Sequence, residues 1–117
     1  MNTAVGLRIA ALVFAPDQTL HAPELIDVEI AQVVRRWVLL EELTEERALE
    51  ALRDCTEMPL TRYAHAILLQ RIWDLRNNLT AYDAAYVALA EALGTPLVTC
   101  DHALGSAPGH AAEVLLF

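Results

Sequence analysis

The stretch of sequence that decides the fold is NLTAYDAAYVALAEALGTPLVTCD, which runs from Asn78 to Asp101. It opens with polar residues, continues as an apolar run that stops at Gly94, and ends with the short apolar segment PLVTC before the last aspartate. A glycine commonly ends a helix, and a short continuous apolar segment is typical of a buried strand. The stretch therefore predicts a helix followed by a buried strand, with Asp83 in the first turn of the helix and Asp101 just past the strand.

The rest of the chain alternates strand-like with helical segments. Strands are predicted at TLHAP, EMPL and AEVLLF, and helices at residues 3–14, 24–40, 44–55, 62–78 and 81–93. Such alternation favours parallel pairing of the strands and an α/β sandwich. A chain of 117 residues is long enough for one domain of this kind.

Composition narrows the class of protein. Hydrophobic residues make up 56% of the chain, which argues against disorder, and charged residues or prolines interrupt every apolar run before it reaches membrane-spanning length. The N-terminus lacks the charged region of a signal peptide, and the 2 cysteines have no motif spacing, so a cytoplasmic protein with free thiols is expected. The net charge of −8 is opposite to the basic footprint of an ordinary nucleic-acid binder, but an excess of carboxylates suits divalent cations.

Three carboxylates are predicted to lie at one edge of the sheet. Ligands of α/β sheets lie beyond the carboxyl ends of the strands. Asp101 follows the strand PLVTC, Glu29 lies early in the helix after TLHAP, and Asp83 lies in the first turn of its own helix. Thr99, at the end of the same PLVTC strand, is placed to order a water on a metal bound there.

Each carboxylate also has a structural interpretation that the residues alone leave open. Thr80 and Asp83 form a capping-box pattern before an apolar run. Asp101 suits the start of a turn, and Glu29 is followed by arginines at positions 35 and 36 within reach of a salt bridge. The alternative is a Mg²⁺-type site, which takes carboxylates, waters and substrate phosphates as ligands.

Two segments together resemble a known family. TLHAPELIDVEIAQVVRRW and LRNNLTAYDAAYVALAEALGTPLVTCDHAL are similar to PIN domains, specifically the VapC-type toxin ribonucleases of bacterial toxin–antitoxin pairs. The order T-A-Y-D-A, L-A-x-x-L-G and P-L-V-T-x-D is the specific part, and the resemblance covers nearly the whole chain. It implies a single PIN-like domain over residues 1–117, folded as a three-layer α/β/α sandwich with a central parallel sheet.

The resemblance also implies a function. It implies a toxin endoribonuclease that uses Mg²⁺ or Mn²⁺ to hydrolyse RNA phosphodiester bonds, pairs with a cognate antitoxin and forms a homodimer. Glu29, Asp83 and Asp101 match the family's second, third and fourth acidic residues and are expected to be the metal ligands. Thr99 matches the hydroxyl residue that stands just before the fourth acid.

One feature of the family has no counterpart in the sequence. The first acidic residue of PIN domains ends an N-terminal strand, in a pattern such as V-V-D-A-S, and this chain lacks both. We therefore expect a PIN domain truncated at its N-terminus, through an upstream start codon or a degenerate gene. The loss of a central strand would leave two neighbours with open edges, which invite aggregation. Two rival hypotheses follow: a catalytically silent PIN-like module that binds a partner protein, and a small α/β protein whose acids are structural.

The remaining candidates are given structural roles. The 4 histidines have no metal-ligand spacing. Trp37 and Trp73 are expected to be packing residues rather than platforms on which bases stack. Arg76 and Asn78 precede the helix that carries Asp83, where they either face the site or, for the arginine, neutralise a helix C-terminus.

Overall fold

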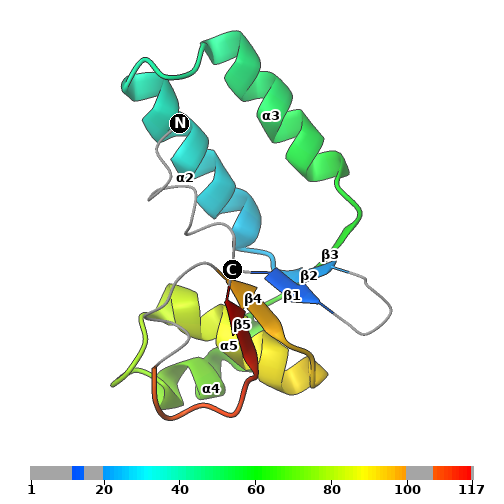
Figure 1. Cartoon of the computed structure of the whole chain (residues 1–117), viewed down its shortest axis with the longest axis vertical. Coiled ribbons are helices and arrows are strands. Elements are labelled where there is room, and N and C mark those ends of the chain that lie inside the picture. Colours follow the sequence, from blue (N-terminus) through cyan, green and yellow to red (C-terminus); the bar gives the residue numbers. More distant parts are fainter. Residues whose placement is uncertain (1–11, 15–19, 100–106, 117) are drawn as a thin grey trace.

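A five-stranded sheet in the order β3-β2-β1-β4-β5 organises the chain (Figure 1). The structure is a computed structural model and describes residues 12–14, 20–99 and 107–116. Its elements are β1 (Leu12–Phe14), β2 (Leu20–Pro23), α2 (Ile26–Leu39), α3 (Glu45–Glu57), β3 (Leu60–Tyr63), the 3₁₀ helix η1 (Ala66–Leu68), α4 (Leu69–Asp74), α5 (Ala81–Leu93), β4 (Leu97–Thr99) and β5 (Val114–Leu116).

The sheet has parallel pairs on both sides of an antiparallel centre. β2 pairs parallel with β3, and β4 pairs parallel with β5. β1 runs antiparallel to both of its neighbours, with Val13 opposite His21 of β2 and Leu12 opposite Val98 of β4. The outer four strands therefore share one direction, and the predicted α/β class with parallel strands is confirmed.

The centre of the sheet corrects two expectations. Residues 12–14 were predicted to end a helix, but they form β1. The central place in the sheet was expected to be vacant, and β1 fills it. The physical reason is hydrogen bonding, because an apolar Leu-Val-Phe segment between β2 and β4 pairs two rows of backbone groups that would otherwise be open.

Helix α5 is the centre of the core. All residues from Ala84 to Ala90 are buried, and the helix contacts β1, β2 and β4. It begins as predicted at Thr80, whose hydroxyl accepts a hydrogen bond from the Asp83 backbone N–H at 3.2 Å. It ends as predicted at Gly94, which has the left-handed φ of 63° that favours glycine.

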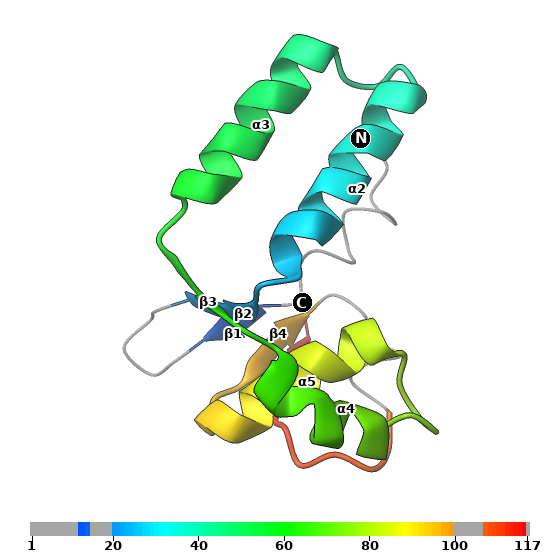
Figure 2. The same cartoon turned by 180° about the vertical axis from the view of Figure 1, so that it is seen from behind.

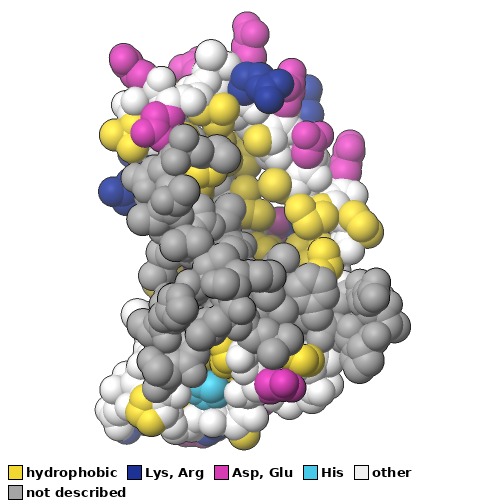
Figure 3. Space-filling model, in the orientation of Figure 1, with side chains coloured by type: hydrophobic (Ala, Val, Ile, Leu, Met, Phe, Trp, Pro, Cys, Tyr) yellow, Lys and Arg dark blue, Asp and Glu magenta, His cyan; other side chains and the backbone are white. Residues whose placement is uncertain are grey.

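Helices α2 and α3 form a hairpin that extends away from the sheet, while α4 and α5 lie on its other side (Figures 1 and 2). The buried stripe of α2 consists of Ile26, Ile30, Val33 and Val34. Apolar side chains gather between the two helices, and acidic side chains surround the outer end of the hairpin (Figure 3). They leave an apolar groove of about 320 Å³, which we call the hairpin groove; its lining includes Val34, Val38, Leu49 and Leu52.

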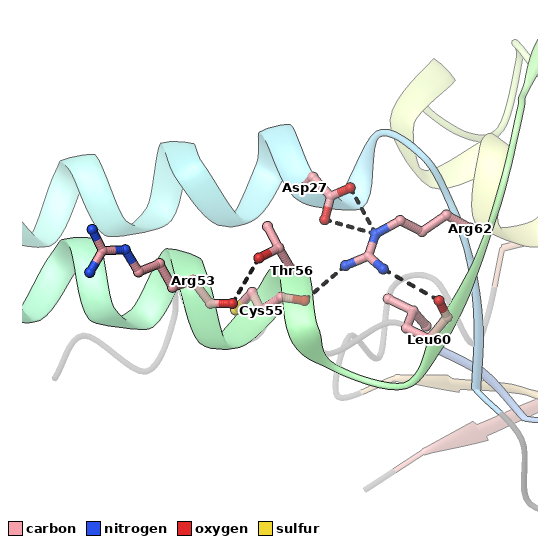
Figure 4. Close-up of polar contacts among 6 residues, drawn as sticks. All are labelled: Asp27, Arg53, Cys55, Thr56, Leu60 and Arg62. Atoms are coloured by element: carbon pink, nitrogen blue, oxygen red, sulfur yellow. Dashed lines mark hydrogen bonds and ion pairs between the residues drawn. The ribbon is translucent and has the colours of Figure 1, made fainter.

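Arg62 of β3 joins the base of this hairpin to the sheet (Figure 4). Its Nε donates to both carboxylate oxygens of Asp27, at 3.0 and 2.8 Å. Its Nη2 donates to the carbonyl of Cys55 at 2.8 Å, and its Nη1 donates to that of Leu60 at 3.3 Å. One guanidinium therefore connects the first turn of α2, the last turn of α3 and β3.

A second ion pair joins α4 and α5 to the segment before β5. Arg71 donates to Oε1 and Oε2 of Glu91 at 2.7 and 2.8 Å, and also to the carbonyl of Gly109 at 3.2 Å. The backbone N–H of Ala111 donates to Glu91 Oε2 at 2.7 Å. The hydrogen bond from Arg71 lowers the pKa of the Glu91 carboxyl, and burial opposes this less strongly.

The segment from 58 to 78 differs most from its prediction. Arg62 and Tyr63 were expected to begin a helix, but they extend β3, where they pair with Ala22 and Pro23. Helical structure starts only at η1.

Trp73 was expected to be a packing residue rather than a base-stacking platform, but it is 61% exposed. Arg76 lies over the Trp73 ring, with its guanidinium carbon 4.4 Å from the centroid, and donates to the Trp73 carbonyl at 3.0 Å. Arg76 thus acts on the C-terminal end of α4, the plainer of its two predicted roles.

Among the described residues, no helix is both long enough and apolar enough to cross a bilayer.

Candidate metal site at the carboxyl ends of the strands

Topology brings the predicted site residues to one edge of the sheet. β2 and β4 point the same way because both are antiparallel to β1. α2 leaves the carboxyl end of β2, and β4 ends at Thr99 on that same edge. α5 leads into β4 and packs across the sheet, so its first turn, which carries Asp83, also lies at this edge.

Glu29 is a half-buried residue of α2. It follows the buried Ile26 by three positions and precedes the buried Val33 by four, which places it beside the apolar stripe of the helix. Its Oε1 accepts a hydrogen bond of 2.5 Å from the hydroxyl of Tyr86 on α5. The structure therefore gives Glu29 a partner that the sequence did not suggest.

Asp83 is also half-buried, in the first turn of α5. It precedes Tyr86 by three residues, so the two lie on one face of the helix. Its negative charge contributes to raising the pKa of the Tyr86 hydroxyl. The two described members of the predicted set, Glu29 and Asp83, therefore both act on Tyr86.

Tyr86 is the functional candidate that sequence reasoning missed. Its side chain is only 2% exposed. Burial is the largest cause of its raised pKa, followed by the hydrogen bond to Glu29 and by the charges of Glu29, Asp83 and Asp27. A tyrosine with a raised pKa stays protonated at neutral pH and so stays a hydrogen-bond donor. The available signal was a tyrosine within the run from Ala84 to Ala90, whose other members are alanine, valine and leucine.

The other candidates divide into those described and those outside the described residues. Thr99 is the last residue of β4, opposite Leu116; its side chain, and the whole of Asp101, lie outside the described residues. Cys55 is a free thiol whose pKa is raised first by burial and then by Asp54 and Asp27, which argues against a reactive cysteine. Within the described part of the chain, no three His, Cys, Asp or Glu side chains form a metal-binding group.

The donor set fits a hard divalent cation. Glu29 and Asp83 are half-buried carboxylates from two different helices, and the negative charge of each helps to raise the pKa of the Tyr86 hydroxyl. Mg²⁺ is commonly held by one or two carboxylates and keeps several waters. Two such side chains at the carboxyl ends of the strands therefore suit this ion better than a transition metal that prefers sulfur or imidazole.

Comparison with known proteins shows the family of this chain. The family model described as PIN domain matches residues 5–109. This chain belongs to the PIN-domain family. The PIN domain seen here is similar to Ribonuclease VapC1 of Mycobacterium tuberculosis (strain CDC 1551 / Oshkosh), with 45% identity over 97 residues that cover 82% of this chain and 73% of the relative.

Two further relatives extend the comparison. Ribonuclease VapC12 of the same strain is 38% identical over 116 residues, which cover 99% of this chain and 88% of the relative. The VapC ribonuclease Mb0985 of Mycobacterium bovis (strain ATCC BAA-935 / AF2122/97) is 46% identical over 84 residues, which cover 72% of this chain and 66% of the relative. The PIN domain of this chain is therefore of the VapC type.

Proposed function

We propose that this chain is a metal-dependent endoribonuclease, the toxin of a VapBC-type toxin–antitoxin pair, which hydrolyses RNA phosphodiester bonds in the cytoplasm. The observation that carries the proposal is the hydrogen bond from the buried Tyr86 hydroxyl to Glu29, which ties α2 to the α5 segment that carries Asp83, at the carboxyl ends of β2 and β4. Similarity to proteins named VapC ribonucleases over most of the chain supports the same chemistry.

Mg²⁺ or Mn²⁺ would be held by the carboxylates of Glu29, Asp83 and Asp101. The Thr99 hydroxyl would hydrogen-bond to a water bound to the metal ion. A bound divalent ion supplies an activated water and neutralises charge on the scissile phosphate. The net charge of −8 means that local positive charge must come from the ion and from individual arginines rather than from the chain as a whole.

Exposed apolar side chains support two protein partners. The first surface is the η1–α4 patch, formed by Ile67, Leu69 and Trp73, which are 85%, 57% and 61% exposed. We propose that this patch is the contact of a homodimer, in which a two-fold axis would bury it in both copies at once. We assign the hairpin groove to the antitoxin, since a concave apolar groove accommodates a narrow segment of another chain.

The activity is tested with purified full-length protein and a fluorogenic RNA. We expect cleavage with Mg²⁺ or Mn²⁺, none after EDTA, and loss to background in Glu29→Gln, Asp83→Asn and Asp101→Asn. The matched control is Glu50→Gln, which alters an exposed carboxylate of α3 that pairs only locally with Arg47. If the wild-type chain binds its antitoxin but cleaves no RNA with either metal, the silent PIN-like module replaces the ribonuclease.

A further inference from the structure

The Tyr86 hydroxyl occupies an unusual place in α5. The helix is buried from Ala84 to Ala90, and its other members there are alanine, valine and leucine. A phenylalanine would bury as much apolar surface without a polar atom, and a buried tyrosine hydroxyl requires a hydrogen-bond partner. The partner is a carboxylate from another helix, Glu29, at 2.5 Å.

The contact has the properties of a positioning interaction. A hydroxyl that donates to a carboxylate makes a short, charge-assisted hydrogen bond. Glu29 has a long side chain whose rotamers cost entropy to fix, and α5 supplies a rigid, buried anchor on which to fix it. Because Asp83 lies three residues before Tyr86, one short segment of α5 both carries one carboxylate and holds the other.

We propose that Tyr86 is a positioning residue that holds the Glu29 carboxylate in its metal-binding place. The proposal rests on the ribonuclease function proposed above. Groups that hydrogen-bond to metal ligands orient them, and their loss typically weakens metal affinity 10–100-fold. The alternative is a purely structural tie between α5 and α2, which would affect stability and leave metal affinity alone.

The test compares two tyrosine hydroxyls. Tyr86→Phe removes the hydroxyl from Glu29, and Tyr63→Phe is the matched control, because Tyr63 makes a 2.7 Å hydrogen bond to Nδ1 of His21 rather than to a carboxylate. Mn²⁺ alone is titrated calorimetrically into each full-length variant. We expect the Mn²⁺ dissociation constant to rise about 10-fold in Tyr86→Phe and to stay within about twofold in Tyr63→Phe. RNA cleavage by Tyr86→Phe should recover at saturating Mn²⁺, so the defect lies in metal affinity.

The outcomes separate this inference from the proposed function. Metal-dependent cleavage with unchanged Mn²⁺ affinity in Tyr86→Phe overturns the positioning role and leaves the ribonuclease intact. A wild-type chain that neither binds Mn²⁺ nor cleaves RNA removes the function itself.

A second measurement needs no Tyr86 variant. The chain has 3 tyrosines, which can be labelled with ¹³C at Cζ. Mg²⁺ should shift the NMR resonance of Tyr86 and leave that of Tyr63 in place. The three resonances are assigned with Tyr63→Phe and Tyr82→Phe. An unshifted Tyr86 signal at saturating Mg²⁺ contradicts the proposal.

Discussion

At the scale of single residues, variants of Thr80 and Asp83 can distinguish a role in helix capping from a role in metal binding. The Thr80 hydroxyl caps α5 by accepting a hydrogen bond from the Asp83 backbone N–H. Thr80→Ala should lower the free energy of unfolding by about 1 kcal/mol and leave RNA cleavage within about twofold. Asp83→Asn should abolish cleavage with a smaller loss of stability, because asparagine keeps the shape of the side chain and is itself a good residue near a helix N-terminus.

Urea unfolding and single-turnover RNA cleavage, measured on both variants, decide between these roles. If Asp83→Asn cleaves RNA normally while its stability falls as far as that of Thr80→Ala, then Asp83 serves the helix and not the metal. The role of the Asp83 side chain could not be read from the capping-box pattern, since the same spacing serves both purposes.

At the scale of elements, the Glu91–Arg71 pair predicts a pH dependence. Arg71 lowers the pKa of Glu91 in the folded state below its ordinary value of 4.5. A carboxyl whose pKa is lowered in the folded state stabilises the protein at pH values above its ordinary pKa. This stabilisation is lost as the pH falls through the lowered pKa of the folded state. At pH 7, the free energy of unfolding of Glu91→Gln should be about 1–2 kcal/mol lower than that of the wild type.

The stability difference between Glu91→Gln and the wild type should shrink as the pH falls below 4.5. Urea unfolding of both proteins at a series of pH values measures this difference. Glu50→Gln again serves as the control, since the Glu50 side chain is 61% exposed and its pair with Arg47 contributes little. A Glu91→Gln defect of the same size at every pH would mean that packing, not charge, is lost.

At the scale of the whole molecule, two apolar surfaces are assigned to two partners, and a crossed pair of variants tests the assignment. Ile67→Glu places a charge in the η1–α4 patch and should convert a dimer to a monomer, measured by light scattering after size exclusion. Leu49→Glu places one in the hairpin groove and should weaken antitoxin binding while the dimer persists. Both side chains are at least half exposed, at 85% and 50%, so the fold should tolerate either change. A monomeric Leu49→Glu with a dimeric Ile67→Glu would reverse the assignment.

The central strand also belongs to this scale. Aggregation was expected from a sheet without its middle strand, because β2 and β4 would then expose unpaired backbone groups. With β1 hydrogen-bonded to both of them, that reason no longer holds for the described residues. β1 provides hydrogen-bonding partners for the backbones of β2 and β4. It does not provide the family's first carboxylate, since its residues are Leu12, Val13 and Phe14.

The sequence by itself determined the elements whose signals are local. Helix α5 has a cap at Thr80, an apolar run and a glycine at position 94, and all three lie within one short stretch. The same holds for α3, predicted over residues 44–55, which begins after Thr44 because the Thr44 hydroxyl accepts a hydrogen bond from the Arg47 backbone N–H. The edge of the sheet that carries Glu29 and Asp83 also followed from the order of strands and helices, because parallel strands bring their carboxyl ends together.

Only the tertiary structure decided the features that depend on distant partners. Residues 12–14 become a strand because β2 and β4 offer backbone groups on both sides, and a helical pattern in the sequence carries no information about them. β3 extends to Tyr63 because β2 pairs with it as far as Pro23. The contact between Tyr86 and Glu29 joins residues 57 positions apart, and such a pairing depends on how two helices pack rather than on the propensity of either one.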